Sequence, residues 1–328
     1  MPSRASWQRQ LRDAVRNVGE LAALLQLPAD ALASEAAARD FPLLVPRAYV
    51  ARIRKRDPRD PLLLQVLPTA HETLAVAGFT PDPLAESEFA RGGVVRKYRG
   101  RSLLITTGAC PVHCRYCFRR AFPYSEQLAA RNDFAEALER LAEDGTREAI
   151  LSGGDPLSLG NARLESLLGR LAALPALRRV RLHTRFPIVL PDRVDRGLVA
   201  LLERARVGVV IVLHANHPRE LDDGVAGALG ALRGAGVTLL NQSVLLRGVN
   251  DDAHVLAELS ERLFECGVLP YYLHLLDPVA GAAHFDVDEP RARQLYRELL
   301  ARLPGYLVPR LVREVPGQAS KTPLPVGL

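Results

Sequence analysis

The chain has 328 residues, of which 48% are hydrophobic and 24% are charged, and its formal net charge is +6. This composition excludes an intrinsically disordered chain, and no apolar run approaches the roughly eighteen residues that predict a membrane-spanning helix. The N-terminus lacks the apolar stretch of a secretory signal, so we expect a cytoplasmic protein. Basic residues are scattered and aromatic residues make up only 5% of the chain, which disfavours nucleic-acid binding.

The first part of the chain has helical patterns punctuated by proline, which predicts a mostly helical cap over residues 1–95. From there to residue 305, short β-branched or apolar runs alternate with longer amphipathic ones. The predicted strands are 102–106, 149–152, 180–183, 207–213, 238–244 and 271–275. The predicted helices are 133–142, 162–174, 192–204, 220–233, 251–266 and 290–303.

This alternation predicts an α/β fold with a parallel sheet and helices outside it. Six strand–helix units are too few for a closed eight-fold barrel but enough for an open, partial βα barrel over residues 96–305. A short segment, 306–328, would follow the barrel. In barrels of this kind the chemistry lies at the carboxyl ends of the strands.

Three of the four cysteines, Cys110, Cys114 and Cys117, follow the first predicted strand in the sequence CPVHCRYCFRR. Three thiolates on one loop can ligate an iron–sulfur cluster and leave one iron open to a ligand. A structural zinc site completed by His113 or Cys266 is the first alternative, although zinc sites usually combine two C-x2-C pairs. Buried cysteines that act as small hydrophobic residues are the second. The spacing and the position of the loop favour the cluster.

Lysine is rare in this chain. Only Lys55, Lys97 and Lys321 are present, and the rest of the 43 basic residues are arginines. A lysine that is kept in such a composition can indicate chemistry that a guanidinium cannot perform, such as Schiff-base formation. Survival by chance remains an equally open explanation for any one of the three.

The cysteine motif after the first strand of a βα barrel resembles the radical S-adenosylmethionine (SAM) superfamily. Further segments along nearly the whole chain resemble lysine 2,3-aminomutases: LLITTGACPVHCRYCFRR, ILSGGDPL, TRFPIVLPDRV, LHANHPRE, NQSVLLRGVND, YYLHLLDPVAGAAHF and GQASKTPL. The short N-terminal part, and the end of the chain soon after Lys321, resemble the compact subfamily that serves translation elongation factor P.

The resemblance implies three cofactors and a set of residues for each. A [4Fe–4S] cluster would be ligated by Cys110, Cys114 and Cys117. SAM would be contacted by Ser152, Gly153, Gly154, Asp155, His214 and Gln242. Pyridoxal 5′-phosphate (PLP) would form a Schiff base with Lys321 and contact Tyr98 and Arg101, of which Arg101 would anchor the phosphate. In the substrate site, Arg119 would bind the carboxylate and Asp277 and Glu314 the distal ammonium.

The activity implied is conversion of L-α-lysine to (R)-β-lysine, which a separate ligase attaches to elongation factor P. The alternative is a radical SAM enzyme without PLP that acts on a macromolecule, by tRNA modification or glycyl-radical activation; a zinc-bearing RNA-binding module is a third possibility. Two positions depart from classical members: PGQASK replaces a glycine-rich stretch before Lys321, and Glu314 replaces Asp. The cysteines that build an intersubunit zinc site in longer relatives are missing, so the resemblance leaves homo-oligomer formation open.

Overall fold

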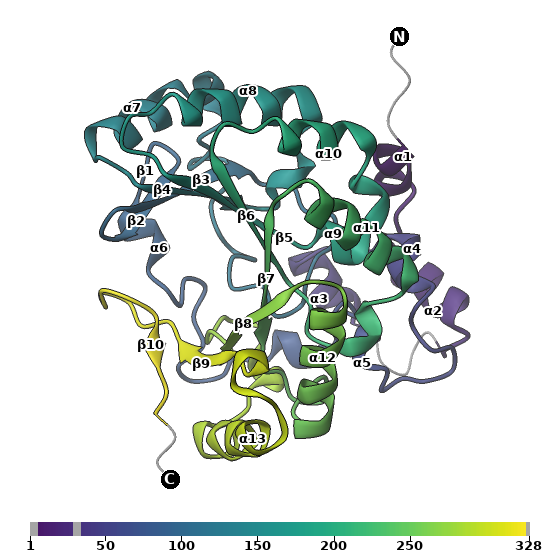
Figure 1. The fold of residues 1–328 in the computed structure, drawn as a ribbon. Coiled ribbons are helices and arrows are strands. Elements are labelled where there is room, and N and C mark those ends of the chain that lie inside the picture. The colour runs from purple at the N-terminus through teal and green to yellow at the C-terminus, as the bar shows by residue number, and fades with distance from the viewer. Residues whose placement is uncertain (1–5, 29–33, 326–328) are drawn as a thin grey trace.

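The computed structural model describes residues 6–28 and 34–325, and within these ranges ten strands form one mixed sheet in chain order (Figure 1). Seven of the described strands, β3 to β9, pair in parallel. They are β3 Arg101–Thr107, β4 Glu148–Gly153, β5 Arg179–Thr184, β6 Gly208–Leu213, β7 Thr238–Val244, β8 Leu269–His274 and β9 Arg310–Arg313. The six predicted strands correspond to β3 to β8.

Antiparallel strands extend the sheet at both edges. The hairpin of β1 (Ala90–Arg91) and β2 (Val94–Tyr98) pairs with β3, and β10 (Thr322–Pro323) pairs with β9. The sequence analysis missed β1, β2, β9 and β10, because strands of two to five residues are too short for a clear alternation of polar and apolar residues. The edge strand β10 directly follows Lys321, the residue that the sequence analysis predicts to form the Schiff base.

Six longer helices lie on the outer side of the curved sheet (Figure 1). They are α7 Ala135–Glu143, α8 Asn161–Ala172, α10 Arg196–Glu203, α11 Asp223–Gly234, α12 Ala253–Glu265 and α13 Glu289–Arg302, and each was predicted. Four begin two to four residues later than predicted, and in three of these an aspartate side chain caps the first turn. Asp195, Asp222 and Asp252 accept hydrogen bonds from backbone amides of α10, α11 and α12, respectively.

The N-terminal part consists of short helices: α1 Ser6–Arg12, α2 Val18–Leu25, α3 Glu35–Asp40, α4 Arg47–Val50, α5 Pro61–Leu64 and α6 Glu86–Phe89. One further short helix, α9 (Phe186–Val189), follows β5. Single 3₁₀ turns lie at Ala70–Thr73, Arg131–Phe134, Pro156–Ser158, Pro191–Arg193, Pro218–Glu220, Ala283–Phe285 and Gly305–Leu307.

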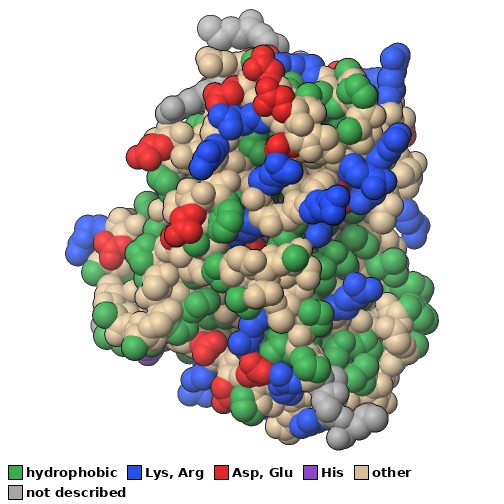
Figure 2. All heavy atoms as spheres, turned by 90° about the vertical axis from the view of Figure 1, so that its left-hand side faces the viewer, with side chains coloured by type: hydrophobic (Ala, Val, Ile, Leu, Met, Phe, Trp, Pro, Cys, Tyr) green, Lys and Arg blue, Asp and Glu red, His purple; other side chains and the backbone are tan. Residues whose placement is uncertain are grey.

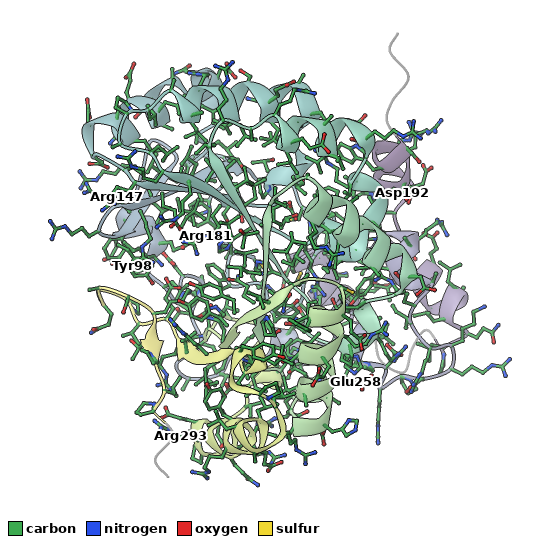
Figure 3. All side chains as sticks on the ribbon, viewed as in Figure 1. Tyr98, Arg147, Arg181, Asp192, Glu258 and Arg293 are labelled. Atoms are coloured by element: carbon green, nitrogen blue, oxygen red, sulfur yellow. The ribbon has the colours of Figure 1, made fainter. Side chains whose placement is uncertain are left out.

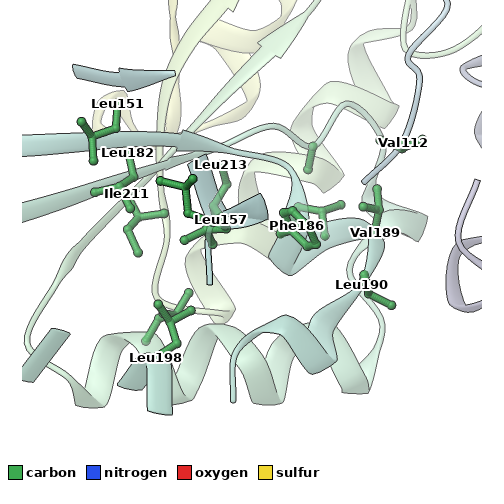
Figure 4. Close-up of a cluster of buried hydrophobic side chains, with 14 of the residues drawn as sticks. Val112, Leu151, Leu157, Leu182, Phe186, Val189, Leu190, Leu198, Ile211 and Leu213 are labelled. Atoms are coloured by element: carbon green, nitrogen blue, oxygen red, sulfur yellow. The ribbon is translucent and has the colours of Figure 1, made fainter. Parts of the chain in front are cut away.

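One hydrophobic cluster joins the N-terminal helices to the sheet. Trp7 and Tyr49 belong to the same cluster as Leu151 of β4 and Phe186 of α9. Figure 4 shows part of this core, including Val112 from the cysteine loop, which is 3% exposed. Burying a valine side chain contributes about 2 kcal/mol, so this contact helps to fix the loop on the core.

The outer surface carries mixed charges. On the face that Figure 2 shows, which is the left-hand side of Figure 1, basic and acidic side chains are interspersed with hydrophobic ones. Among the described helices, none is long and apolar enough to cross a membrane.

Candidate active site

A cavity of about 270 Å³ lies against the inner side of the sheet and beneath the cysteine loop. All of the site residues predicted from the sequence line this one cavity: Tyr98, Arg101, Cys110, Cys114, Cys117, Arg119, Ser152, Gly153, Gly154, Asp155, His214, Gln242, Asp277, Glu314 and Lys321. Residues more than two hundred positions apart in the chain therefore share one space.

The cysteine loop is held in place by the N-terminal part. The backbone N–H of His113 donates to the carbonyl of Leu44 (3.0 Å), and that of Arg115 donates to the carbonyl of Gln65 (2.9 Å). Burial, together with the charges of the neighbouring thiols, raises the pKa of Cys117 to about 11 and that of Cys110 well above its ordinary value. Three partly buried thiols that repel one another when ionised fit a cationic cluster, because its irons offset this repulsion.

Neither residue proposed to complete a zinc site, His113 or Cys266, lines the cavity with the three cysteines. The Nδ1 atom of His113 lies 2.7 Å from the carbonyl oxygen of Pro42, and its ring stacks on Phe41, outside the cavity lining. Cys266 ends α12 and does not line the cavity either. In the described ranges no three His, Cys, Asp or Glu side chains converge on one metal ion, whereas a [4Fe–4S] cluster takes each thiolate on a different iron.

The glycines of the SGGD turn allow it to pack against the start of the cysteine loop. A Cβ atom on Gly154 would lie 2.4 Å from the carbonyl oxygen of Ala109, so no side chain fits there. The N–H groups of Gly154 and Asp155 donate to the carbonyls of Thr107 (2.7 Å) and Ala109 (2.8 Å). These two amides therefore bind the protein and are not free to bind a ligand.

The Asp155 carboxylate joins the ends of β4 and β5. It accepts hydrogen bonds from the Thr184 hydroxyl (2.8 Å), the backbone N–H of Arg185 (2.7 Å) and the backbone N–H of Leu157 (3.0 Å). Burial raises the pKa of Asp155 to about 6 in spite of these bonds. The carboxylate is fully engaged in holding the turn, so SAM would be met by the neighbouring atoms of the turn.

Arg119 forms a buried ion pair with Glu86, a residue that sequence reasoning missed. Its Nε and Nη2 atoms donate to the two carboxylate oxygens (2.6 and 2.9 Å), and Nη1 donates to the Ser152 hydroxyl (3.0 Å). Burial alone would raise the pKa of Glu86, but Arg119 and then Lys97 keep it below its usual value. Each terminal nitrogen of the guanidinium carries two hydrogens. The edge between Nη1 and Nη2 can therefore still take a second carboxylate.

Lys97 and Lys321 both bind the carboxylate of Glu314. The Lys321 Nζ atom donates to Oε2 (2.6 Å) and the Lys97 Nζ atom to Oε1 (3.1 Å), while Lys97 also lies 3.3 Å from Glu86. Although burial opposes ionisation, Lys321 and Lys97 lower the pKa of Glu314 to about 2. An ion-pair chain thus runs from Arg119 to Lys321.

Asp277, after β8, lines the cavity, and no cation is bound to its carboxyl group among the described residues. Burial and then the negative charge of Glu314 raise the pKa of Asp277 to about 7. An uncompensated acid in this position favours a ligand that brings its own positive charge.

Three histidines line the inner wall. Gln242 Nε2 lies 2.9 Å from His214 Nε2, and burial lowers the pKa of His214 to about 3, so its imidazole is neutral. Two more were missed, His183 of β5 and His274 of β8, whose Nε2 atoms are buried without a hydrogen-bond partner among the described residues. For His274 the available signal was its position at the end of an otherwise apolar strand.

Another part of the cavity lining consists of basic and aromatic side chains. Arg101 stacks over the ring of Tyr98 at 4.8 Å and has no carboxylate bound to it in the described part of the chain. Arg181 of β5, which was missed, lines the cavity and pairs with Glu148. Figure 3 labels both Tyr98 and Arg181.

Comparison with known proteins adds a family to this geometry. The Radical SAM superfamily matches residues 104–259. The L-lysine 2,3-aminomutase of Escherichia coli is 48% identical over 100% of this chain and 96% of its own length. The Haemophilus influenzae protein of the same name is 44% identical over 97% of this chain and 95% of its own. The one from Clostridium subterminale is 34% identical over 97% of this chain and 77% of its own.

Proposed function

Because this chain belongs to the L-lysine 2,3-aminomutase family of radical SAM enzymes, and is thus an isomerase of the aminomutase type, we propose that it converts L-α-lysine to (R)-β-lysine with the help of PLP. The observation that carries the proposal is the position of Lys321. A rare lysine from the C-terminal segment lines the same cavity as the cysteine loop, so an amine for PLP and ligands for a cluster face one space.

The radical SAM family implies SAM and a [4Fe–4S] cluster, which together supply the radical that removes an unactivated hydrogen. Cys110, Cys114 and Cys117 would hold the cluster. The neutral His214–Gln242 pair, at 2.9 Å, also lines the cavity and would contact SAM. Since His214 stays uncharged, it can hydrogen-bond a hydroxyl or ring nitrogen without repelling the sulfonium.

Lys321 would hold PLP covalently through Nζ, and PLP would carry the migrating amino group. Arg101 would anchor the phosphate, because its guanidinium faces the cavity free of carboxylates in the described residues. Tyr98 keeps that guanidinium in place by stacking.

The substrate would lie between Arg119 and Asp277. Glu86 and Ser152 fix the Arg119 guanidinium, and its remaining Nη1–Nη2 edge would bind the α-carboxylate of lysine. Asp277 would receive the distal ammonium. Glu314 would join Asp277 once Lys321 no longer presents an ammonium to it, because only Lys97 would then share its carboxylate.

Two finer proposals rest on the sequence resemblance. The sheet would be the partial βα barrel, with a cap at 1–95 and a C-terminal segment at 306–328 that delivers Glu314 and Lys321. The product would serve elongation factor P through a separate lysyl ligase.

Anaerobic incubation of the reconstituted protein with L-lysine, SAM, PLP and a reductant, followed by chiral product analysis, tests the proposal. We expect (R)-β-lysine that depends on both SAM and PLP. Lysine turnover that does not require PLP would contradict the proposal, and a modified RNA or protein as the only product would support the macromolecule-modifying alternative.

A further inference from the structure

Arg185 places a positive charge directly on one of the cluster ligands. It follows β5, is 5% exposed, and its Nη1 atom donates to the Sγ atom of Cys114 at 2.8 Å and to the Tyr116 hydroxyl at 2.6 Å. Local sequence patterns do not indicate this contact, because the two residues lie 71 positions apart.

The guanidinium is held from its other side. Nη2 donates to Gln65 Oε1 (2.7 Å) and to Glu220 Oε2 (3.2 Å). Glu220 is fully buried and is itself fixed by Gln65 Nε2 (2.8 Å) and the backbone N–H of Asn216 (3.2 Å). The orientation of the Arg185 guanidinium is therefore set by Gln65 and Glu220, neither of which lines the cavity.

A purely structural arginine looks different in this protein. Arg193 is fully buried as well, but its Nε and Nη2 atoms donate to the backbone carbonyls of Leu157 (2.6 Å) and Leu159 (3.0 Å). Anchoring of loops needs only such contacts. Arg185 instead directs one nitrogen at a sulfur that the family motif assigns to iron.

We propose that Arg185 is a positioning residue that raises the reduction potential of the cluster through its charge-assisted N–H···S bond to Cys114. Reduction adds one electron from an external donor to the oxidised cluster and makes or breaks no covalent bond. The extra negative charge is stabilised by a nearby cation and by hydrogen bonds to the sulfurs, so both effects favour the reduced form. Glu220 acts in the opposite direction, because its buried negative charge offsets part of the charge of Arg185.

The test is a redox titration of the reconstituted cluster, followed by electron paramagnetic resonance, in the parent protein and three variants. In Arg185→Met we expect the ratio of reduced to oxidised cluster at a fixed poise to fall at least tenfold, a shift of about 59 mV to more negative potential. In Glu220→Gln, which keeps the shape and most hydrogen bonds, we expect a shift to more positive potential. Arg193→Met, the matched loss of a buried arginine away from the cysteines, should leave the potential unchanged.

The opposite signs separate tuning from simple disruption of the fold. Shifts in the same direction for Arg185→Met and Glu220→Gln, or no shift in either, would overturn the proposal. If Arg185→Met does not assemble a cluster, Glu220→Gln decides, and the absence of a positive shift contradicts the proposal. The titration needs neither lysine nor PLP, so its result is independent of the proposed substrate.

Discussion

The Nζ atom of Lys321 lies 2.6 Å from Oε2 of Glu314, and the other oxygen of the same carboxylate binds Lys97 at 3.1 Å. Two of the three lysines in this arginine-rich chain thus meet at one carboxylate inside the cavity. Both carboxylate oxygens of Glu314 therefore bind a lysine, whereas Asp277 nearby has no cation bound to it among the described residues. The two acids should therefore behave differently when replaced.

Replacing Lys321 with arginine keeps the positive charge but removes the amine that can bond PLP covalently. We expect Lys321→Arg to lose the visible absorbance of bound PLP and to form no β-lysine. Reductive cleavage of SAM, which needs only the cluster, should persist without coupling to substrate. Formation of β-lysine at the parent rate would show that another residue holds PLP.

Much of the fold, and the position of the cysteine loop in it, could be predicted from the sequence. The six predicted strands and helices are present because their periodic patterns run for whole elements, and the cysteine loop follows the first of these strands as expected. Local spacing cannot reveal contacts between distant segments. Glu86, in a short helix before the sheet, gave no signal, yet it binds Arg119 33 positions away. The bonding of Gly154 and Asp155 to the cysteine loop was equally invisible.

Asp277 should make lysine binding depend on pH. Its pKa is about 7 because of burial and the charge of Glu314, so the acid is neutral below this pH and ionised above it. An ammonium binds the ionised form, so the KM for lysine should rise up to about tenfold for each pH unit below 7. We expect Asp277→Asn to raise KM at least about tenfold at pH 8, a loss of ~1.4 kcal/mol, and to abolish this pH dependence. A parent KM that stays constant between pH 6 and 8 would argue against ammonium binding by Asp277.

Glu314→Gln should mainly destabilise the PLP-free protein, because Lys97 and Lys321 lose their shared anion. Removing one partner of a buried ion pair costs about 3 kcal/mol or more. The pKa of Glu314 is lowered to about 2, so its contribution is present above the ordinary carboxylic range and disappears as the pH falls through 2. Urea unfolding at pH 7 measures this loss. The KM for lysine should rise less than in Asp277→Asn, because Glu314 shares its carboxylate with Lys97, and no rise at all would mean that Glu314 does not bind the ammonium.

The cysteines offer a matched pair of variants. Cys114→Ala removes a thiol that lines the cavity, and we expect loss of the cluster's iron and of SAM cleavage. Cys266→Ala removes a thiol at the end of α12, outside the cavity lining, and should retain both. Iron analysis and quantification of 5′-deoxyadenosine check the two outcomes. Loss of iron in the Cys266 variant would refute ligation by the three loop cysteines alone.

We propose that one cavity holds the cluster, PLP and a substrate lysine whose distal ammonium the protein recognises. Its most direct test compares L-lysine with L-norleucine, which has the same chain length but no distal charge, in anaerobic reactions with SAM, PLP and reductant. The account predicts β-lysine from lysine and at least about a hundredfold lower kcat/KM for norleucine, because Asp277 would be left without a cation. Comparable kcat/KM values for the two amino acids would contradict it.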